Sequence, residues 1–432
     1  MSLPSPVTSD RDRPTKVDVV VIGGGIAGIA TALELGERGN SVAVFEKGIV
    51  AGEQSSRNWG WCRRMGRDPR ELPLIEESMR LWQQMHQRTG EDVGFRECGI
   101  AYLCDSEEKL AARQRWYQNH AQPYGLSSRM VSAEEANALT PDSTVPWLGG
   151  LFTAEDGRAE PVLAVPAMAR AAQKCGVKIF QHCAVRGLQQ QAGRISGVVT
   201  EHGEISCDAV VLAGGAWSRR FCHNAGIGLP QLTVVNSVMR TAPLQTGYDH
   251  SLAARDFAFR KRMDGGYTVA HATLSMADIL PDSFRLAPEF WPVLKEEWRD
   301  FRFRIGQRFV DEARLKRRWE LDEESPFEQV RILDPKPIAS IQQAAMHSLK
   351  NTLPAFTNAK IEETWAGVID VTPDVVPVIS PVAEREGFYL ATGFSGHGFG
   401  LGPGAGKLMA QIVNGETPCV NPEPFRYERF FQ

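Results

Sequence analysis

An unbroken apolar run near the start of the chain leads directly into a cluster of glycines. Residues 19–22 read Val-Val-Val-Ile, and Gly-Gly-Gly-Ile-Ala-Gly follows at 23–28 before an Ala- and Leu-rich stretch. A second apolar run covers residues 41–46. Continuous apolar runs of this kind are typical of strands buried on both faces. The pattern therefore predicts a strand, a tight turn, a helix and a second strand parallel to the first.

The rest of the chain alternates between helical and strand-like periodicity. Helical patterns cover residues 72–88, 107–120, 132–139, 161–175 and 403–413, and residues 277–322 are expected to be helical and heavily charged. Strand patterns cover residues 95–103, 177–180, 209–215 and 387–393, and residues 232–270 alternate like an antiparallel sheet. Ser132 followed by Glu135 predicts a capping box at the start of the helix over 132–139.

Glycine-rich turns follow three apolar strands that are far apart along the chain. They begin at Gly23, at Gly214 and at Gly393. If the three turns hold one ligand, two domains must be interleaved rather than joined in series. We therefore predict an α/β protein in which a Rossmann-type domain of residues 14–65, 150–228 and 360–432 is interleaved with an antiparallel-sheet substrate domain. The substrate domain is expected to contain residues 66–149 and 229–359, with a helical insertion near 277–322.

The first glycine turn has the spacing of a dinucleotide-binding site. Gly23 would make the tight turn, Gly25 would let the backbone approach a pyrophosphate, and Gly28 would let the helix pack closely on the strand. The phosphates would then lie at the positive N-terminus of the helix. Glu46 ends the second strand, where a carboxylate can accept hydrogen bonds from both hydroxyls of an adenosine ribose. The turn by itself allows either FAD or NAD.

Length and composition narrow the class of protein. A chain of 432 residues exceeds the usual size of one domain, and a net charge of -4 gives no sign of a nucleic-acid partner. No stretch has the about 18 consecutive apolar residues that a membrane-spanning helix needs. Residues 1–13 are polar and are expected to be a disordered lead-in rather than a signal peptide. We therefore expect a cytoplasmic protein.

Two further patterns bear on binding. The eight cysteines have neither a CxxC pair nor a histidine at zinc spacing, so we expect reduced thiols and no metal site. A basic and aromatic run over residues 298–309 resembles a patch for nucleic acid or acidic lipid. Acidic residues are interleaved around that run, so a solvated or subunit-facing helix is the favoured interpretation.

Several later motifs make the chain similar to one known family. The loop after Glu46 contains Ser-Ser-Arg-Asn-Trp-Gly at 55–60, and residues 213–218 read Ala-Gly-Gly-Ala-Trp-Ser. Near the end come WAGVIDVTPDVVPVI at 365–379 and GFSGHGFGLGPGAGK at 393–407. With the first glycine turn, these motifs resemble the D-amino-acid oxidase/sarcosine oxidase (DAO) superfamily over almost the whole chain. The resemblance implies a glutathione-reductase-like FAD fold of the DAO type.

The resemblance also implies FAD as the cofactor and assigns its contacts. The cysteine and histidine that tether flavin in some relatives have no clear counterpart here, so FAD is expected to be non-covalent. The implied cofactor-binding residues are Gly23, Gly25, Ile26, Ala27, Gly28, Glu46, Lys47, Gln54, Ser55, Ser56, Asn58, Trp59, Gly60, Trp61, Val185, Gly214, Gly215, Trp217, Gly393, Gly396, His397, Gly398, Phe399 and Gly400.

The activity implied by the resemblance is oxidation of the C–N bond of a secondary amine or amino acid. Sarcosine-, proline-, opine- and D-amino-acid-like substrates all fit, with hydride transfer to flavin N5 and hydrolysis of the resulting imine. Many D-amino-acid oxidases carry a carboxylate-binding arginine just after W-x-G, where this chain has Val368 and Ile369. Another arginine is then needed as the clamp. The candidates are Arg260, Arg262, Arg63 and Arg64.

Three residues are predicted to be catalytic. His397 lies between glycines in the turn expected to cover the flavin, Arg260 could clamp a substrate carboxylate, and Tyr267 could reach the substrate pocket. Each also has a structural interpretation. His397 could hold its turn by a hydrogen bond, and sheet alternation explains Arg260 and Tyr267 without any role in chemistry.

The sequence also allows other functions. A flavin monooxygenase also begins with GxGxxG, but its later Gly-Asp motif is missing here. A flavin-binding subunit of a multi-subunit amino-acid dehydrogenase is the main alternative, with the charged segment 277–322 as its contact surface. The protein could thus be a homo-oligomer or require a partner subunit. The electron acceptor could be O2 or a quinone or other carrier.

Overall fold

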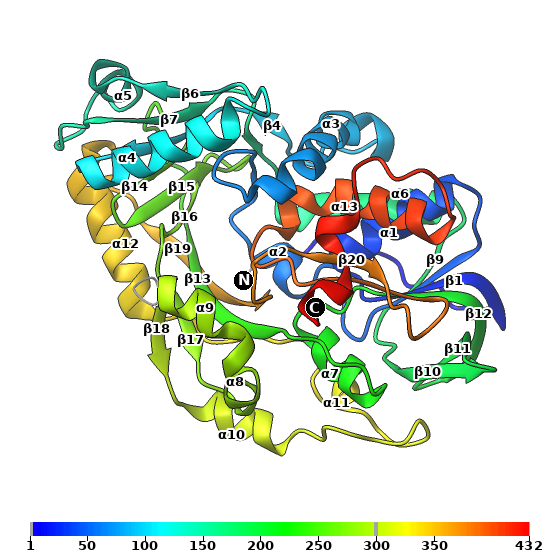
Figure 1. Ribbon diagram of the computed structural model, residues 1–432. Helices are drawn as coiled ribbons and strands as arrows, with labels where there is room; N and C mark the ends of the chain where they lie inside the picture. The colour runs from blue at the N-terminus through cyan, green and yellow to red at the C-terminus, as the bar shows by residue number, and fades with distance from the viewer. Residues whose placement is uncertain (1–2, 298–300, 432) are drawn as a thin grey trace.

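The computed structural model describes residues 3–297 and 301–431, which fold around two large sheets (Figure 1). The first sheet has eight strands, in the order β10-β11-β12-β1-β2-β9, with β21 beside β12 and β20 beside β21. β1 pairs in parallel with both β2 and β12, as the apolar runs predict. The strands are β1 (Lys16–Ile22), β2 (Val42–Phe45), β9 (Lys178–Phe180), β10 (Val185–Gln191), β11 (Arg194–Thr200), β12 (Gly203–Leu212), β20 (Val378–Pro381) and β21 (Phe388–Thr392).

Both faces of the first sheet are buried. Alternate side chains of β1 point to opposite cores, with Val19 and Val21 in one and Val20 and Ile22 in the other. Residues of four helices join the first core: α1 (Ile26–Glu37), α3 (Leu72–Thr89), α6 (Pro161–Lys174) and α13 (Gly398–Val413). The second core includes residues of α7 (Ser218–Asn224) and α11 (Pro326–Gln329).

The second sheet is mostly antiparallel, as predicted for the substrate side. It has ten strands in the order β18-β17-β13-β16-β15-β14-β5-β7-β6, with β19 also beside β13. One face packs on α12 (Ala339–Thr352) through a core rich in aromatic side chains. The strands are β5 (Ile100–Cys104), β6 (Ser128–Val131), β7 (Gly149–Thr153), β13 (Leu232–Thr241), β14 (Ser251–Ala254), β15 (Phe257–Lys261), β16 (Tyr267–His271), β17 (Ser275–Asp278), β18 (Phe301–Arg304) and β19 (Ile361–Val371).

Short elements connect the two sheets. A third, three-stranded sheet contains β3 (Trp61–Cys62), β8 (Gly157–Arg158) and β4 (Arg96–Glu97). The remaining helices are α2 (Gln54–Arg57), α4 (Glu107–Trp116), α5 (Ala133–Leu139), α8 (Pro281–Arg285), α9 (Ala287–Glu297) and α10 (Gln307–Arg314). Single turns are η1 (Pro69–Glu71), η2 (Tyr117–Ala121), η3 (Gly215–Trp217), η5 (Pro354–Phe356), η6 (Glu423–Phe425) and η7 (Tyr427–Phe430).

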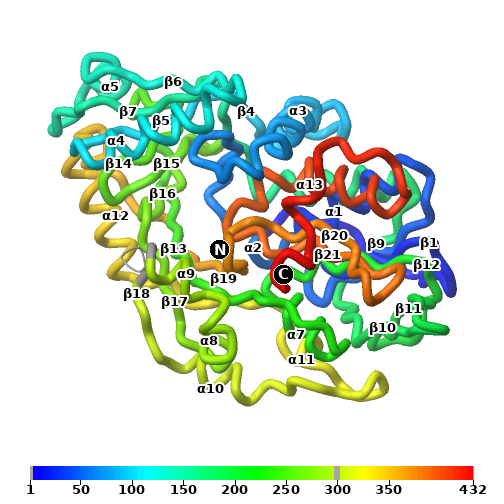
Figure 2. Tube along the Cα trace, in the orientation of Figure 1, coloured from blue at the N-terminus to red at the C-terminus, as the bar shows by residue number. Residues whose placement is uncertain are grey.

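The two sheets take their strands from alternating stretches of the chain, but β7 and β19, which the predicted bounds place in the Rossmann-type domain, belong to the second sheet. Figure 2 shows the C-terminal α13 returning to lie beside the N-terminal α1. The two helices approach closely because α13 presents glycines to α1. A Cβ atom added to Gly406 would lie 2.5 Å from the backbone carbon of Ala30. This contact joins the two ends of the chain in one layer.

Several elements differ from their predicted bounds. The strand expected over 95–103 is split into β4 and β5, and the last helix begins at Gly398 rather than near residue 403. The segment 277–322 is not wholly helical, because β18 lies within it and pairs in parallel with β17. The Phe-Arg-Phe-Arg alternation of residues 301–304 has the period of a strand and explains this difference. Residues 298–300 of the basic and aromatic run lie outside the described residues.

The N-terminal segment is ordered where it is described, so the expected disordered lead-in is wrong for residues 3–13. The Ser5 N–H donates to the Val162 carbonyl oxygen (2.8 Å), and the Asp10 N–H donates to the Ile179 carbonyl oxygen (2.8 Å). The predicted capping box of Ser132 and Glu135 is confirmed at α5. All eight cysteines are unpaired, as expected. Among the described residues, the helices are too short or too polar to cross a membrane.

Candidate active site

The turn between β1 and α1 forms part of the wall of a large cavity. Gly23 has a φ of 112°, and a Cβ there would lie 2.4 Å from the Ala213 carbonyl oxygen, so the turn requires glycine. Glu46 follows β2 and accepts hydrogen bonds from the backbone N–H groups of Gly24 (2.7 Å) and Gly48 (2.7 Å). Burial raises the pKa of the Glu46 carboxyl group. Its oxygens have lone pairs left for ribose hydroxyls.

The cavity has a volume of about 590 Å³ and is lined from all three predicted glycine segments. The predicted cofactor residues that line it are Gly23, Gly25, Ile26, Ala27, Glu46, Lys47, Gln54, Ser55, Asn58, Trp59, Gly60, Trp61, Val185, Gly214, Gly215, Trp217, Gly396, His397, Gly398 and Phe399. Gly28, Ser56, Gly393 and Gly400 do not line it. Gly28 instead lets α1 pack on the turn, since a Cβ there would lie 2.1 Å from the Gly23 carbonyl oxygen.

The cavity fits the charge distribution of FAD. The N-terminus of α1 reaches it at Gly25 and Ile26, and the N-terminus of α13 reaches it at His397 and Gly398. The unpaired N–H groups at a helix N-terminus carry partial positive charge and favour anions. One of these positive helix ends can bind the pyrophosphate of FAD, and the other can stabilise the negative charge on a reduced flavin. The residues present can therefore hold this cofactor.

The loop after β2 is held rigidly where it borders the cavity. The Asn58 side-chain amide donates to the Ser55 carbonyl oxygen (3.0 Å), and its Oδ1 accepts from the Gly60 N–H (2.8 Å). Trp59 and Trp61 pack edge to face with ring centroids 5.4 Å apart. The Trp61 side chain is buried, and its Nε1 has no partner among the described residues. A buried donor of this kind costs about 1–3 kcal/mol unless a ligand accepts from it.

Arg63 is the candidate clamp that remains available to a ligand. It lines the cavity and is half-buried, and its Nη1 donates to the Met65 carbonyl oxygen. Within the described part of the chain, no carboxylate forms an ion pair with it. Arg64 and Arg262 are engaged elsewhere, because Arg64 pairs with Glu76 (2.6 Å) and Arg262 pairs with Asp264 (3.0 Å).

Arg260 does not line the large cavity, so the prediction that it clamps a substrate is wrong. Its side chain is 1% exposed, and its two terminal nitrogens donate to the two Glu160 oxygens at 2.8 and 2.9 Å. The Nε donates to the Trp59 carbonyl oxygen. Burial opposes ionisation of Glu160, but Arg260 lowers the pKa of this carboxyl group to about 2. The pair ties the loop of Trp59 to the start of α6, and both terminal nitrogens of Arg260 are occupied by Glu160.

Tyr267 is also outside the cavity, so its predicted catalytic role is wrong. It is fully buried on β16, and its hydroxyl donates to the Tyr248 carbonyl oxygen (2.7 Å). The ring packs against Phe259 and Phe356 in the core beneath α12. Its position in the strand turns it toward this core, because successive strand residues alternate between the two faces.

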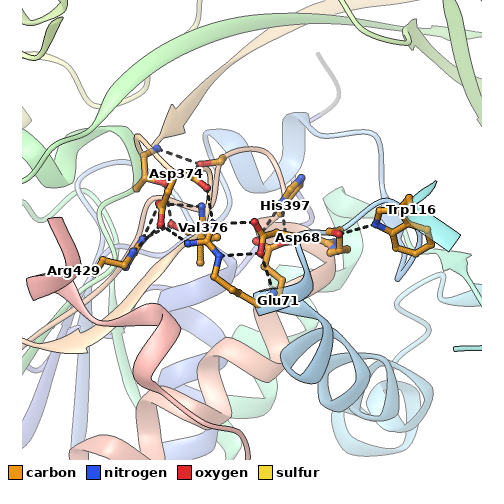
Figure 3. Close-up of polar contacts among 11 residues, drawn as sticks. Asp68, Glu71, Trp116, Asp374, Val376, His397 and Arg429 are labelled. Atoms are coloured by element: carbon orange, nitrogen blue, oxygen red, sulfur yellow. Dashed lines mark hydrogen bonds and ion pairs between the residues drawn. The ribbon is translucent and has the colours of Figure 1, made fainter. Parts of the chain in front are cut away.

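His397 is the predicted catalytic residue that does lie at the cavity. It occupies the N-cap position of α13, and its Nδ1 is 3.0 Å from a Glu71 oxygen (Figure 3). Burial lowers the pKa of His397, so the ring is neutral near pH 7. Donation from Nδ1 to the carboxylate assigns the proton to Nδ1 and leaves a lone pair on Nε2.

Glu71 and Arg67 complete this cluster, and sequence reasoning missed both. Glu71 is fully buried and also accepts from Arg67 Nη1 (3.4 Å), whose side chain lines the cavity. Burial would raise the pKa of Glu71, but His397 and Arg67 hold it below its ordinary value. Burial lowers the pKa of Arg67 to about 10, so this side chain stays charged at neutral pH. The high density of charged residues over 63–71 is the sequence feature that could have pointed to Glu71 and Arg67.

Polar contacts around the cluster hold its segment in place (Figure 3). The Trp116 Nε1 donates to the Arg67 carbonyl oxygen (2.9 Å), and Arg70 pairs with Asp68 (2.9 Å). Arg70 and the C-terminal Arg429 both pair with Asp374, each at 2.9 Å. The start of α3 is thereby anchored to the C-terminal segment that carries His397.

Two more cavity residues were not predicted as site residues. Asp370 is buried and accepts from the Gly393 N–H (2.7 Å) and Gln231 Nε2 (2.9 Å), which fixes the turn before α13. Burial raises the pKa of its carboxyl group. Asn236 on β13 also lines the cavity, and its Oδ1 is buried without a partner among the described residues.

Comparisons with known proteins give consistent matches. The family described as FAD dependent oxidoreductase (DAO) matches residues 18–412. The structure of L-amino acid deaminase from Proteus myxofaciens, in complex with anthranilate, has a TM-score of 0.94 and 36% identity over 98% of this chain and 96% of that one. Sarcosine oxidase subunit beta of Arthrobacter sp is 26% identical over 96% of this chain and 91% of its own.

A longer relative is matched only in part. The 4-methylaminobutanoate oxidase of Paenarthrobacter nicotinovorans is 24% identical over 98% of this chain, which spans 47% of that relative's length. The expected fold class is confirmed by these matches. The family match also confirms the prediction of an FAD-dependent oxidoreductase.

Proposed function

Because this chain belongs to the DAO family of FAD-dependent oxidoreductases, we propose that it oxidises the carbon–nitrogen bond of an α-amino acid. When bound, FAD supplies the acceptor for the hydride that leaves the substrate carbon. The observation that carries the proposal is Arg63, a cation that forms no ion pair with a carboxylate of the described residues and that lines the same cavity as the predicted FAD contacts. The chain's own residues then have to bind the carboxylate, accept the amine proton and exclude water.

Arg63 and Trp61 are proposed to bind the substrate carboxylate. A guanidinium can donate two parallel hydrogen bonds to a carboxylate, and among the described residues no carboxylate lies within ion-pair distance of Arg63, although the buried Asp156 is near enough to feel its charge. Trp61 adds a buried Nε1 donor for which the described part of the chain offers no acceptor. Both side chains line the cavity and lie two positions apart along the chain. Together their donors would replace the hydrogen bonds to water that a substrate carboxylate loses when it enters the cavity.

His397 is proposed to take the proton from the substrate ammonium. The amine must be uncharged before its lone pair can assist loss of hydride from the adjacent carbon. His397 is neutral and has Nε2 free to accept a proton, while Glu71 stabilises the imidazolium that forms. Asn236 Oδ1 is a further acceptor for a substrate N–H.

The other cavity walls favour an apolar side chain on the substrate. Val238, Phe290, Val293 and Ile369 line the cavity beyond the predicted cofactor residues. The solved L-amino acid deaminase of Proteus myxofaciens, at 36% identity, supports an L-amino acid. We therefore rank L-amino acids with large apolar side chains first, ahead of sarcosine-, proline-, opine- and D-amino-acid-like compounds.

The test is anaerobic bleaching of the flavin spectrum by a panel of L-, D- and N-methyl amino acids, opines and simple amines. Arg63→Met should raise the concentration needed for half-maximal bleaching by about 10- to 1000-fold, because a charge-assisted pair with the carboxylate is lost. Arg63→Lys should recover part of this affinity. Arg96→Met, on exposed β4, is the matched control and should behave like the unaltered protein.

Two outcomes would contradict the proposal. If no amino acid or amine bleaches the flavin, oxidation of a C–N bond is wrong. If simple amines without a carboxylate bleach it as well as amino acids, and Arg63→Met is without effect, then the carboxylate clamp is wrong.

A second candidate function is a flavin-binding subunit of a multi-subunit amino-acid dehydrogenase. The match to a sarcosine oxidase subunit over 91% of that subunit's length favours it. Turnover by the isolated chain with a small-molecule electron acceptor would contradict this candidate. Bleaching without turnover, restored by other subunits, would support it.

A further inference from the structure

We propose that a second cavity, between α7 and the charged insertion, binds a small polyvalent oxyanion. The cavity has a volume of about 170 Å³. Its walls come from α7 and β13 on one side and from α8, α10 and the residues after α10 on the other. Figure 1 shows α7 next to α8, and the ion pair of Arg219 with Asp282 (2.7 Å) joins these two helices.

The charged groups that line this cavity leave an excess of positive charge. Its arginines are Arg219, Arg220, Arg285, Arg308 and Arg317, and its carboxylates are Asp282 and Glu312. Arg220 pairs with Glu312, and Arg308 pairs with Asp278 (2.8 Å), which lies outside the cavity wall and also pairs with Arg304 (2.8 Å). Three arginines therefore share the single carboxylate of Asp282.

Arg317 is the arginine with the weakest protein partner. Its nearest carboxylate oxygen, on Asp282, is 3.8 Å away, whereas Arg219 and Arg285 contact the same carboxylate at 2.7 and 2.8 Å. Burial lowers the pKa of Arg317, and the nearby arginines lower it further. Burial and the same cluster also lower the pKa of His223 in this cavity. An anion at this point would offset the repulsion among these cations.

A neutral donor completes the site. The hydroxyl of Thr233 on β13 lines the cavity, and its Oγ1 is buried without a partner among the described residues. Guanidinium groups and a hydroxyl together are the donors that recognise phosphate and carboxylate oxygens. The volume is below the about 300–1,000 Å³ of pockets for drug-sized ligands. The cavity thus favours a compact ligand, such as one with a pyrophosphate or tricarboxylate group, over a nucleotide or a peptide.

The second cavity shares walls with the candidate active site. Trp217 and Val368 line both cavities. Trp217 is also held by Lys47, whose Nζ lies 4.5 Å from the ring centroid, and by a hydrogen bond to Glu53 (3.2 Å). An anion that draws α7 and α8 together would therefore act on a side chain that borders the predicted FAD site.

The experiment measures oxyanion binding to the FAD-loaded protein, so that pyrophosphate cannot occupy the cofactor site. Pyrophosphate and citrate are titrated separately by calorimetry and by thermal unfolding, with potassium chloride at equal ionic strength as the reference. We expect saturable binding of at least one of the two and a rise in Tm that chloride does not produce. Pyrophosphate alone would assign a phosphate ligand, citrate alone a polycarboxylate ligand, and either result supports the site.

The variants separate this site from general attraction to a basic surface. Arg317→Ala should weaken the Kd by about tenfold or more, as loss of one charge-assisted hydrogen bond predicts. Arg314→Ala removes the same charge from an exposed residue of α10 that does not line the cavity, and should change the Kd by less than about twofold. Thr233→Val keeps the charge and the shape but removes the hydroxyl, and should also weaken binding.

Two results would overturn the proposal. The first is the absence of saturable binding of both anions beyond the effect of chloride. The second is an equal loss of affinity in Arg317→Ala and Arg314→Ala with no effect of Thr233→Val. The readouts do not depend on substrate turnover, so they stand apart from the proposed amino-acid oxidation.

Discussion

At the scale of single residues, the polar cluster at the cavity depends on Glu71. This carboxylate is fully buried and lies between the His397 ring and the Arg67 guanidinium, both of which line the cavity. A buried carboxylate that accepts from Nδ1 sets the tautomer and the orientation of the imidazole. We assign Glu71 a positioning role, because it acts on a substrate only through His397.

Glu71→Gln should change the pH dependence of the reaction as well as its rate. Protonation of His397 removes the proton acceptor, so kcat/KM should fall as the pH drops through the His397 pKa, which burial has lowered. The Glu71 charge raises that pKa, so its removal should move the acid limb to lower pH. The maximal kcat should fall by at least about tenfold, with little change in KM. Steady-state kinetics across a pH series measures both effects.

Glu77→Gln is the matched control on α3, the helix that Glu71 precedes, since Glu77 pairs with Arg80 and Lys407 away from the cavity. An acid limb that stays in place in Glu71→Gln would show that Glu71 has only a structural role.

At the scale of elements, the close approach of α1 and α13 positions both ends of the FAD site. α1 follows the first glycine turn, and α13 carries His397 at its N-cap. The two helices share a core and meet where Gly406 faces Ala30. The Gly-Phe-Gly-Leu-Gly-Pro-Gly run of residues 398–404 is therefore part of a packed helix rather than an extended flexible turn.

Gly406→Ala should destabilise the protein even though alanine has the higher helix propensity. The new methyl group would lie 2.5 Å from the Ala30 backbone carbon, and backbone atoms cannot move aside as a flexible side chain can. Overpacking of this kind costs about 1–3 kcal/mol. We expect a lower Tm and weaker FAD retention. Gly228→Ala is the matched control, because a Cβ there has no neighbour closer than 4.0 Å; equal Tm values for the two variants would contradict the packing argument.

At the scale of the whole molecule, one cavity joins segments from the start, the middle and the end of the chain. Gly23 and Glu46, Val185 and Gly214, and Gly396 all contribute to its wall. A ligand bound there holds the interleaved segments together. Binding to the folded state alone stabilises a protein by about 2.7 kcal/mol when the ligand is at 100 times its Kd. FAD should therefore raise the Tm of the apoprotein, and the whole protein should unfold in one transition.

Glu46→Ala should weaken FAD binding by roughly 1.5–3 kcal/mol, as the loss of charge-assisted hydrogen bonds to the ribose predicts. The rise in Tm on addition of FAD should shrink correspondingly. Glu46 also holds the N–H groups of Gly24 and Gly48, so Glu46→Gln serves as a milder second variant. Fluorescence titration of the apoprotein with FAD measures the Kd. Glu384→Ala, on the surface, is the control, and an unchanged Kd in Glu46→Ala would refute the role of Glu46.

The sequence by itself determined the parts of this protein that depend on local geometry. A buried strand, the Gly23 turn and Glu46 could be read directly, because glycine spacing and strand length follow from backbone geometry within about thirty residues. The later glycine turns and the family resemblance extended the predicted site from this first turn to three separate segments of the chain. Most of the predicted cofactor residues do line one cavity.

Only the tertiary structure decided which charged side chains are free for chemistry. Arg260 and Arg63 look alike in the sequence, but Arg260 meets Glu160, 100 positions away, and Arg63 meets no carboxylate among the described residues. His397 gains its partner Glu71 across 326 positions, and the glycines of α13 allow it to lie against α1. Ion pairs and close helix contacts form between segments that folding brings together, so no local pattern records them.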